Sequence, residues 1–157
     1  MDNVKKHLIF KGAVAQFELD PFGIHGVNHW HRVFDHAMNI LRLLEDSYDV
    51  DHADEWFLWN FAMLHDSCRT SDLTDIEHPY RAAKMIPDND TQFNVRLRAA
   101  ILGHSSGKLT NDRLAGICWD ADRLDLPRIG IVPDPDYMST KVGREFAENM
   151  RRKPEGE

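Results

Sequence analysis

The sequence predicts an all-α protein, a single-domain helical bundle of about five to seven helices. Apolar residues recur at spacings of three and four along most of the chain, and the alternating pattern of β-strands is almost absent. A chain of 157 residues suits one domain. Hydrophobic residues make up 42% and charged residues 29%, which is typical of a folded domain and excludes a disordered chain.

The clearest helix is predicted to begin near Gly26. Its apolar positions follow the spacing of an amphipathic helix: Trp30, Val33, Phe34, Ala37, Met38, Leu41 and Leu44. A second helix is predicted to end at His65, with Asp51 or Asp54 capping its amino end. Residues 72–75 are polar and are expected to form a loop.

Two helices are expected in the middle of the chain. Residues 77–86 form a short one, which Pro87 stops. Residues 91–104 form a longer one, in which Thr91 is the amino-terminal cap. The glycine-containing segment 103–107 breaks this helix and predicts a turn.

The last part of the chain predicts two more helices. Residues 111–126 form one, which Pro127 ends, and a stripe at steps of four from Met138 to Met150 forms the other. Residues 22–150 are therefore expected to be the helical domain, which the motifs quoted below identify further, with residues 1–21 packing on it. Residues 151–157 are expected to form a flexible tail.

Charge and composition exclude several classes of protein. The net charge of −7 argues against binding to long nucleic acids or to a membrane surface, because both need a basic face. The apolar run over residues 56–64 is far shorter than the ~20 residues of a membrane span. Cys68 and Cys118 are the two cysteines, and they form no metal-binding or disulfide motif. A cytoplasmic protein is expected; the sequence leaves its oligomeric state open, with a homodimer as one option.

Nine histidines are the first indication of a metal site, because histidine is the commonest metal ligand. His65 and Asp66 end a strongly apolar helix, and a buried carboxylate is costly unless it is paired or bound to metal. A buried hydrogen bond between the two residues is the alternative interpretation. His29 lies beside the apolar stripe of its helix, where a core histidine is equally an alternative.

Three further positions add to this pattern. Asp120 and Asp122 lie on nearly opposite faces of one helix, so one of them at most points into a shared pocket, and periodicity does not choose between them. His78 and His104 lie at predicted helix ends, where caps are the alternative interpretation. Inward histidines and carboxylates on facing helices are how helical bundles build metal sites. This donor set suits Mn, Fe, Co, Ni or Zn.

Five strings in this order resemble the motifs of the HD-domain superfamily of metal-dependent phosphohydrolases, in particular its small stand-alone members. The strings are HGVNHWHRV at 25–33, LHDSCRTSD at 64–72, EHPYRAA at 77–83, ILGHSSG at 101–107 and WDADRLDLPRIG at 119–130. The resemblance covers about residues 22–146. Pro79 stands where the family usually has glycine.

The resemblance implies a set of metal ligands. It favours His29 over His25 and His31, and Asp122 over Asp120. The implied ligands of one divalent ion are His29, His65, Asp66 and Asp122; His78 and His104 complete a second metal site or face the substrate phosphate. His25 is then expected to contact a ligand, and structural or surface roles are left for His7, His31, His36 and His52.

The resemblance also implies a function, hydrolysis of a small phosphoester such as a nucleotide by metal-activated water. Asp66 would contact both the ion and the water. Arg69 stands where several HD nucleotide hydrolases have a catalytic glutamate, and a cation there suits phosphate binding, together with Arg81 or Lys108. Asp72 is the expected substitute for the missing acid–base group.

Two alternatives remain at this stage. One is an HD module that binds metal or nucleotide without catalytic turnover, which the arginine at position 69 favours. The other is an oxygenase of the two-iron branch of the superfamily, which needs both histidine pairs to hold two ions. The sequence therefore predicts one or two metal ions and does not distinguish between these two numbers.

Overall fold

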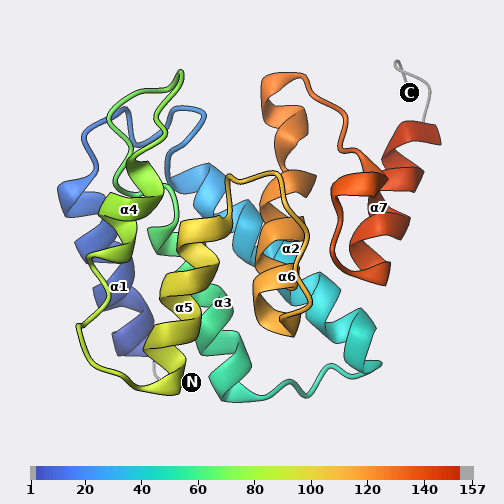
Figure 1. The fold of residues 1–157 in the computed structure, drawn as a ribbon, viewed down its shortest axis with the longest axis horizontal. Helices are drawn as coiled ribbons and strands as arrows, with labels where there is room; N and C mark the ends of the chain where they lie inside the picture. Colours follow the sequence, from blue (N-terminus) through green and yellow to red (C-terminus); the bar gives the residue numbers. More distant parts are fainter. Residues whose placement is uncertain (1–2, 153–157) are drawn as a thin grey trace.

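The computed structural model describes residues 3–152 (Figure 1). In this part of the chain there are seven α-helices, two 3₁₀-helices and no strand, which confirms the all-α prediction. The elements are α1 (Asn3–Gln16), α2 (Val27–Glu45), α3 (His52–Leu64), α4 (His78–Ala83), α5 (Gln92–Gly103), α6 (Arg113–Leu124), η1 (Leu126–Ile129), η2 (Pro135–Tyr137) and α7 (Lys141–Arg152).

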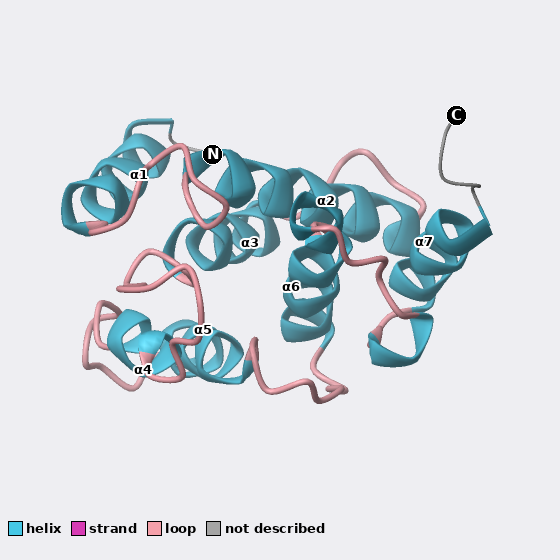
Figure 2. Cartoon of the chain, turned by 90° about the horizontal axis from the view of Figure 1, so that it is seen from above, coloured by secondary structure: helices cyan, strands magenta, loops and turns pink. Residues whose placement is uncertain are grey.

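The long helix α2 is central to the bundle. It packs against α3, α6 and α7, and α5 packs against α3, α4 and α6. Figures 1 and 2 show α7 at one end of the molecule and α1 and α4 toward the other. The core between these helices contains large apolar side chains that are fully buried, among them Trp30, Phe57, Phe61, Ile101 and Ile117. One contiguous core therefore supports every helix that later contributes to the site.

Several predicted helix starts are confirmed with their caps. The Asp51 side chain accepts a hydrogen bond from the Ala53 amide at 2.6 Å, so Asp51 rather than Asp54 caps α3. The Thr91 hydroxyl accepts from the Asn94 amide at 3.2 Å and caps α5. Each cap satisfies an amide that the first turn of a helix leaves without a partner.

Some predicted boundaries are wrong. Helix α6 ends at Leu124, and Pro127 lies inside the following 3₁₀-helix, where its missing N–H costs nothing. The last helix was predicted to start at Met138. Met138 is buried but precedes α7, which begins at Lys141 and continues through Arg152. The first two residues of the predicted flexible tail are therefore helical, and residues 153–157 lie outside the described residues.

Helix α1 was not among the predicted helices, although residues 1–21 were expected to pack on the domain. It packs against α3 and buries only Ala13 completely. The Lys6 ammonium lies 2.5 Å from the Glu55 carboxylate, and the Trp59 indole N–H donates to the Lys6 carbonyl at 3.1 Å. Contacts with its neighbour rather than a strong apolar stripe therefore hold this helix in place.

Gly26 allows the preceding loop to fold back on the start of α2. The Val27 amide donates to the Pro21 carbonyl at 2.7 Å, and a Cβ at position 26 would lie 2.1 Å from that oxygen. Only glycine permits this close approach. The result is that His25 and His29, on either side of this turn, point toward the same region.

Two further expectations concern the chain as a whole. None of the helices described between residues 3 and 152 is long and apolar enough to cross a membrane. Cys68 and Cys118 both carry free thiols, as the absence of a disulfide motif predicts.

Candidate metal centre

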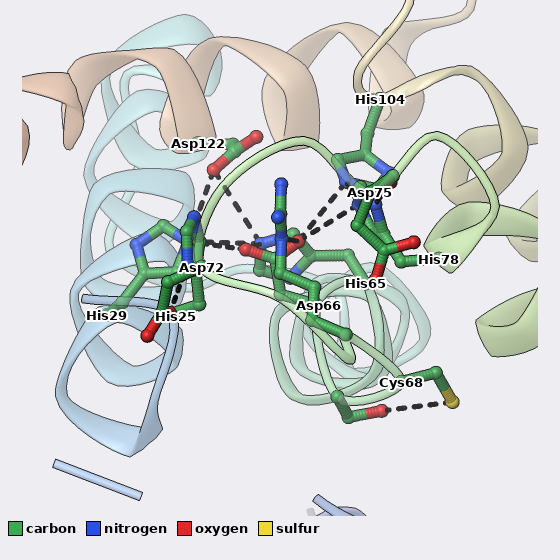
Figure 3. Close-up of polar contacts among 12 residues, drawn as sticks. His25, His29, His65, Asp66, Cys68, Asp72, Asp75, His78, His104 and Asp122 are labelled. Atoms are coloured by element: carbon green, nitrogen blue, oxygen red, sulfur yellow. Dashed lines mark hydrogen bonds and ion pairs between the residues drawn. The ribbon is translucent and has the colours of Figure 1, made fainter. Parts of the chain in front are cut away.

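The ends of five helices bring the implied ligands together (Figure 3). His29 lies in the first turn of α2 and Asp122 in the last turn of α6. The remaining ligands lie at three other helix ends: His65 and Asp66 directly after α3, His78 at the start of α4 and His104 directly after α5. Side chains that are distant in sequence therefore meet at one buried place.

The first cluster consists of His29, His65, Asp66 and Asp122. The Nε2 atoms of His29 and His65 are 3.2 Å apart. Asp66 Oδ2 lies 3.4 Å from the first nitrogen and 3.7 Å from the second. Asp122 Oδ1 lies 3.3 Å and 3.6 Å from the same two atoms. Two imidazole nitrogens and two carboxylate oxygens thus face a common centre.

The second cluster consists of Asp66, His78 and His104. The two Nε2 atoms are 3.0 Å apart. Asp66 Oδ1 lies 3.1 Å from that of His78 and 3.5 Å from that of His104. Asp66 therefore belongs to both clusters, with one carboxylate oxygen turned to each.

Burial separates these groups from bulk water. All four histidines and Asp66 are buried, whereas the Asp122 side chain is 19% exposed. Unpaired charged groups in such surroundings are costly, so the carboxylates require positive partners. Asp122 is the most exposed ligand of the first cluster.

Backbone carbonyls fix the tautomers of three histidines. His65 Nδ1 donates to the Ala62 carbonyl at 3.0 Å, His104 Nδ1 donates to the Ile101 carbonyl at 2.7 Å, and His78 Nδ1 donates to the Asp75 carbonyl. Because a carbonyl oxygen only accepts, each Nδ1 carries a proton. Each Nε2 lone pair is therefore available at the centre.

A carboxylate fixes His29 in the same way. His29 Nδ1 donates to Asp125 Oδ2 at 2.7 Å, and the Arg32 guanidinium holds Asp125 through Nε at 2.7 Å and Nη2 at 3.0 Å. Such a partner orients a metal-binding histidine and raises its basicity. Neither Asp125 nor Arg32 was predicted as a site residue from the sequence. The spacing of three residues between Asp122 and Asp125 is the signal that places them on one helical face.

These tautomers leave each histidine pair with two lone pairs facing each other. At 3.2 Å and 3.0 Å the facing Nε2 atoms repel unless a proton or a metal ion lies between them. Each pair thus requires one positive charge. Nitrogen and carboxylate donors in this arrangement are positioned to hold a metal ion.

The pKa values of the buried histidines and carboxylates depend on one another. Burial lowers the pKa of His29, but its contacts with Asp122, Asp125 and Asp66 outweigh burial and raise it to about 10. Burial raises the pKa of the Asp122 carboxyl, but contacts with His29 and His65 hold it well below its ordinary value. The pKa of Asp66 is also well below its ordinary value, because His65 and the other histidines outweigh burial. Both carboxylates are therefore ionised, as a cation site requires.

The structure distinguishes the two candidate aspartates of α6. Asp120 points away from the clusters and accepts from the Ser139 amide, the Thr140 amide and the Thr140 hydroxyl, each at 2.7 Å. It connects α6 to the start of α7. Asp122 points into the first cluster.

Arg69 and Asp72 occupy different places relative to the clusters. Arg69 Nε donates to Asp66 Oδ1 at 3.1 Å, so its guanidinium belongs to the edge of the second cluster. Asp72 Oδ1 accepts from His25 Nδ1 at 2.8 Å, and its side chain is 45% exposed. The Asp72 carboxylate therefore contacts His25 rather than any of the implied ligands.

The two other predicted phosphate-binding residues do not contact the clusters. The Arg81 guanidinium donates to the Cys68 carbonyl at 3.0 Å and to the Asp75 carboxylate. Lys108 lies exposed in the loop between α5 and α6, and no contact of its ammonium group with other described residues is found. Arg81 therefore supports the loop that carries Asp75, whose carbonyl fixes His78.

The fold and the clusters together define an all-α protein with a buried histidine–aspartate centre positioned to hold a metal ion. Comparisons of the chain with protein-family models, with curated proteins and with solved structures found no match. The interpretation of the site therefore depends on its own geometry.

Proposed function

We propose that this chain is a metal-dependent phosphohydrolase of the HD superfamily that acts on a small phosphoester such as a nucleotide. The observation that carries the proposal is the convergence of His29, His65, Asp66 and Asp122, in the order of the HD motifs, on one buried centre. These residues would hold one ion of Mn, Fe, Co, Ni or Zn. When bound, such an ion lowers the pKa of water and polarises a phosphoryl oxygen.

The protein's own groups supply the remaining roles. Asp66 orients the attacking water through the carboxylate that faces both clusters. Arg69, which contacts Asp66, neutralises negative charge that develops on the phosphoryl group. Asp72 accepts or returns a proton at Oδ1, because this carboxylate is open to solvent and is held by His25.

A cavity of about 310 Å³ is lined by Arg69, the residue that contacts Asp66, and by none of the implied ligands themselves; its charge supports a small anionic substrate. Three basic side chains line it, those of Arg69, Arg81 and Lys84, against one acidic side chain, that of Glu18. This local excess of positive charge contrasts with the net charge of −7. The cavity thus favours a small phosphorylated molecule over a long polyanion.

The test is a panel of nucleotides and p-nitrophenyl phosphate, each with Mn²⁺, Co²⁺ or Ni²⁺. We expect metal-dependent phosphate release that His65→Ala abolishes. His52→Ala is the matched control, because this histidine is 79% exposed on the far end of the same helix. Absence of metal-dependent turnover, with His65→Ala equal to the parent protein, would overturn the proposal.

A module that binds metal or nucleotide without turnover is the second candidate. The contact between Arg69 and Asp66 favours it, because the guanidinium occupies an oxygen that hydrolysis would use. Isothermal titration with non-hydrolysable and natural nucleotides separates the two functions. Tight binding of a natural nucleotide without product supports the module.

A further inference from the structure

The two clusters differ in the carboxylate oxygens that they hold. The first cluster has two, Asp66 Oδ2 and Asp122 Oδ1, facing its histidine pair. The second cluster has one, Asp66 Oδ1, among the carboxylates of residues 3–152. Two carboxylates balance the charge of one divalent ion, whereas a second ion would depend on a single shared oxygen.

Arg69 places a positive charge on that shared oxygen. Its Nε atom donates to Asp66 Oδ1 at 3.1 Å, the same separation as between this oxygen and His78 Nε2. His104 Nε2 lies 3.5 Å from it. The guanidinium therefore competes for the one anionic donor that an ion between His78 and His104 would need.

The loop after α3 holds Arg69 in this position. Its Nη1 atom donates to the Ser71 carbonyl at 3.1 Å and to the Leu73 carbonyl at 3.3 Å. The side chain is 14% exposed. Removing the guanidinium from Asp66 would therefore break several hydrogen bonds at once, so its charge is a fixed part of the site.

We propose that Arg69 is the built-in cation of the second cluster, so that the chain binds one divalent ion tightly in the first cluster and a second one weakly. A second ion would lie beside a fixed guanidinium in a buried site, where repulsion between like charges is strong. The inference rests on the metal site of the proposed function. It opposes a two-iron oxygenase, which needs both clusters loaded.

The experiment measures metal count and affinity without substrate. The full chain is stripped with a chelator and titrated with Co²⁺ and Zn²⁺ by calorimetry, with elemental analysis after desalting. We expect one retained ion in the parent protein and two in Arg69→Met, with second-site affinity raised about ten- to hundredfold. Arg69→Lys, which keeps the charge, is expected to retain one.

Two controls locate the effect. Arg98→Met removes an α5 guanidinium that donates to the Pro87 carbonyl at 2.9 Å, and we expect it to retain one ion. The double variant Arg69→Met/His104→Gln is expected to return from two ions to one. Helix content and thermal unfolding establish that each variant is folded.

The outcomes separate the inference from the proposed function. Two ions of similar affinity in the parent protein would overturn the inference, as would a single ion in folded Arg69→Met. A parent protein that binds no ion would instead overturn the proposed metal centre. One ion without phosphoester hydrolysis would leave the role of Arg69 standing and reject the phosphohydrolase.

Discussion

Helix α6 presents two carboxylates to different surroundings. Asp120 faces α7 and accepts three hydrogen bonds from backbone and hydroxyl donors of residues 139–140. It lies so close to α7 that a Cβ on Gly143 would be 2.3 Å from its Oδ2 atom. Asp122 faces the first cluster, where its Oδ1 atom lies 3.3 Å from His29 Nε2 and 3.6 Å from His65 Nε2.

The difference shows how to distinguish a structural carboxylate from a ligand. Fixed donors already satisfy Asp120, so it needs nothing further. The neighbours of Asp122 are two histidines whose Nδ1 protons are held by other partners, so its charge is balanced at the centre, by a proton on His29 in the metal-free protein or by a metal ion. The hydrogen-bond partners of each carboxylate therefore carry more information than its position on the helix.

The largest difference between the two aspartates is expected from Asp122→Asn. We expect metal affinity to fall more than about hundredfold, because one of the two charges that balance the ion is lost. The metal-free protein should also lose stability at neutral pH, because Asp122 helps to raise the pKa of His29. Calorimetric titration with Co²⁺ measures the affinity, and urea unfolding measures the stability. Unchanged affinity would remove Asp122 from the ligand set.

Asp120→Asn is expected to leave metal affinity unchanged and to lower stability. Its amide group places N–H donors against the Ser139 and Thr140 donors, so unfolding free energy should fall by about 1–3 kcal/mol. Metal affinity should remain that of the parent protein. Urea unfolding and the same titration test both points, and a loss of metal with intact stability would contradict the structural assignment.

A smaller effect is expected from Asp125→Asn, which changes the partner of His29 Nδ1 and leaves the ligands themselves intact. Metal affinity should fall about ten- to hundredfold, or about 1.4–2.7 kcal/mol. Asp134→Asn is a matched control, because that carboxylate caps η2 and pairs with Arg151, where it contacts no implied ligand. An affinity equal to that of the parent protein would show that the histidine orientation does not depend on Asp125.

The smallest effect, taken per pH unit, is the dependence of metal affinity on pH. The pKa of His29 is raised from 6.5 to about 10, so in the metal-free protein this histidine is protonated at neutral pH. Binding an ion releases that proton, so affinity should rise by up to about tenfold per pH unit between 6.5 and 10. Calorimetry in buffers of different ionisation enthalpy counts the protons.

The same shift fixes the sign of the stability change in the metal-free protein. Because the folded pKa lies above the ordinary value, the contribution of His29 is fully present below pH 6.5 and is lost as pH rises through about 10. Urea unfolding across this range should show stability falling with pH. Affinity and stability that do not change between pH 6.5 and 10 would contradict the charge state assigned to His29.

The sequence predicted those parts of the fold that depend on residues close together in the chain. The apolar stripe of α2 and the caps Asp51 and Thr91 are read from neighbouring residues, and the structure confirms them. Helix α1 was missed because contacts with α3 stabilise it and its own apolar pattern is weak. The end of α6 was placed too late because Pro127 fits the start of a 3₁₀-helix.

The site shows a similar division. Periodicity did not show which of Asp120 and Asp122 is the ligand, because residues two apart on a helix point to nearly opposite sides. The groups packed on each side of α6 decide between them. The motif order led to Asp122. The roles of Asp125 and Arg32 required three-dimensional contacts, since Asp125 is 96 positions from the histidine it orients. Arg69 was expected to bind phosphate, but its contact with Asp66 emerges from the folded loop.

The spacing of the ligands along the chain makes an ion at this centre a cross-link. His29 and His65 are 36 positions apart, and His78 and His104 are 26 positions apart. Joining such distant points lowers the conformational entropy of the unfolded chain, by an amount that grows only slowly with the length of the closed loop. Since the ligands come together only when the helices assemble, an ion held here would bind the folded chain in preference to the unfolded one. The supply of metal would thus raise the folded fraction of the protein.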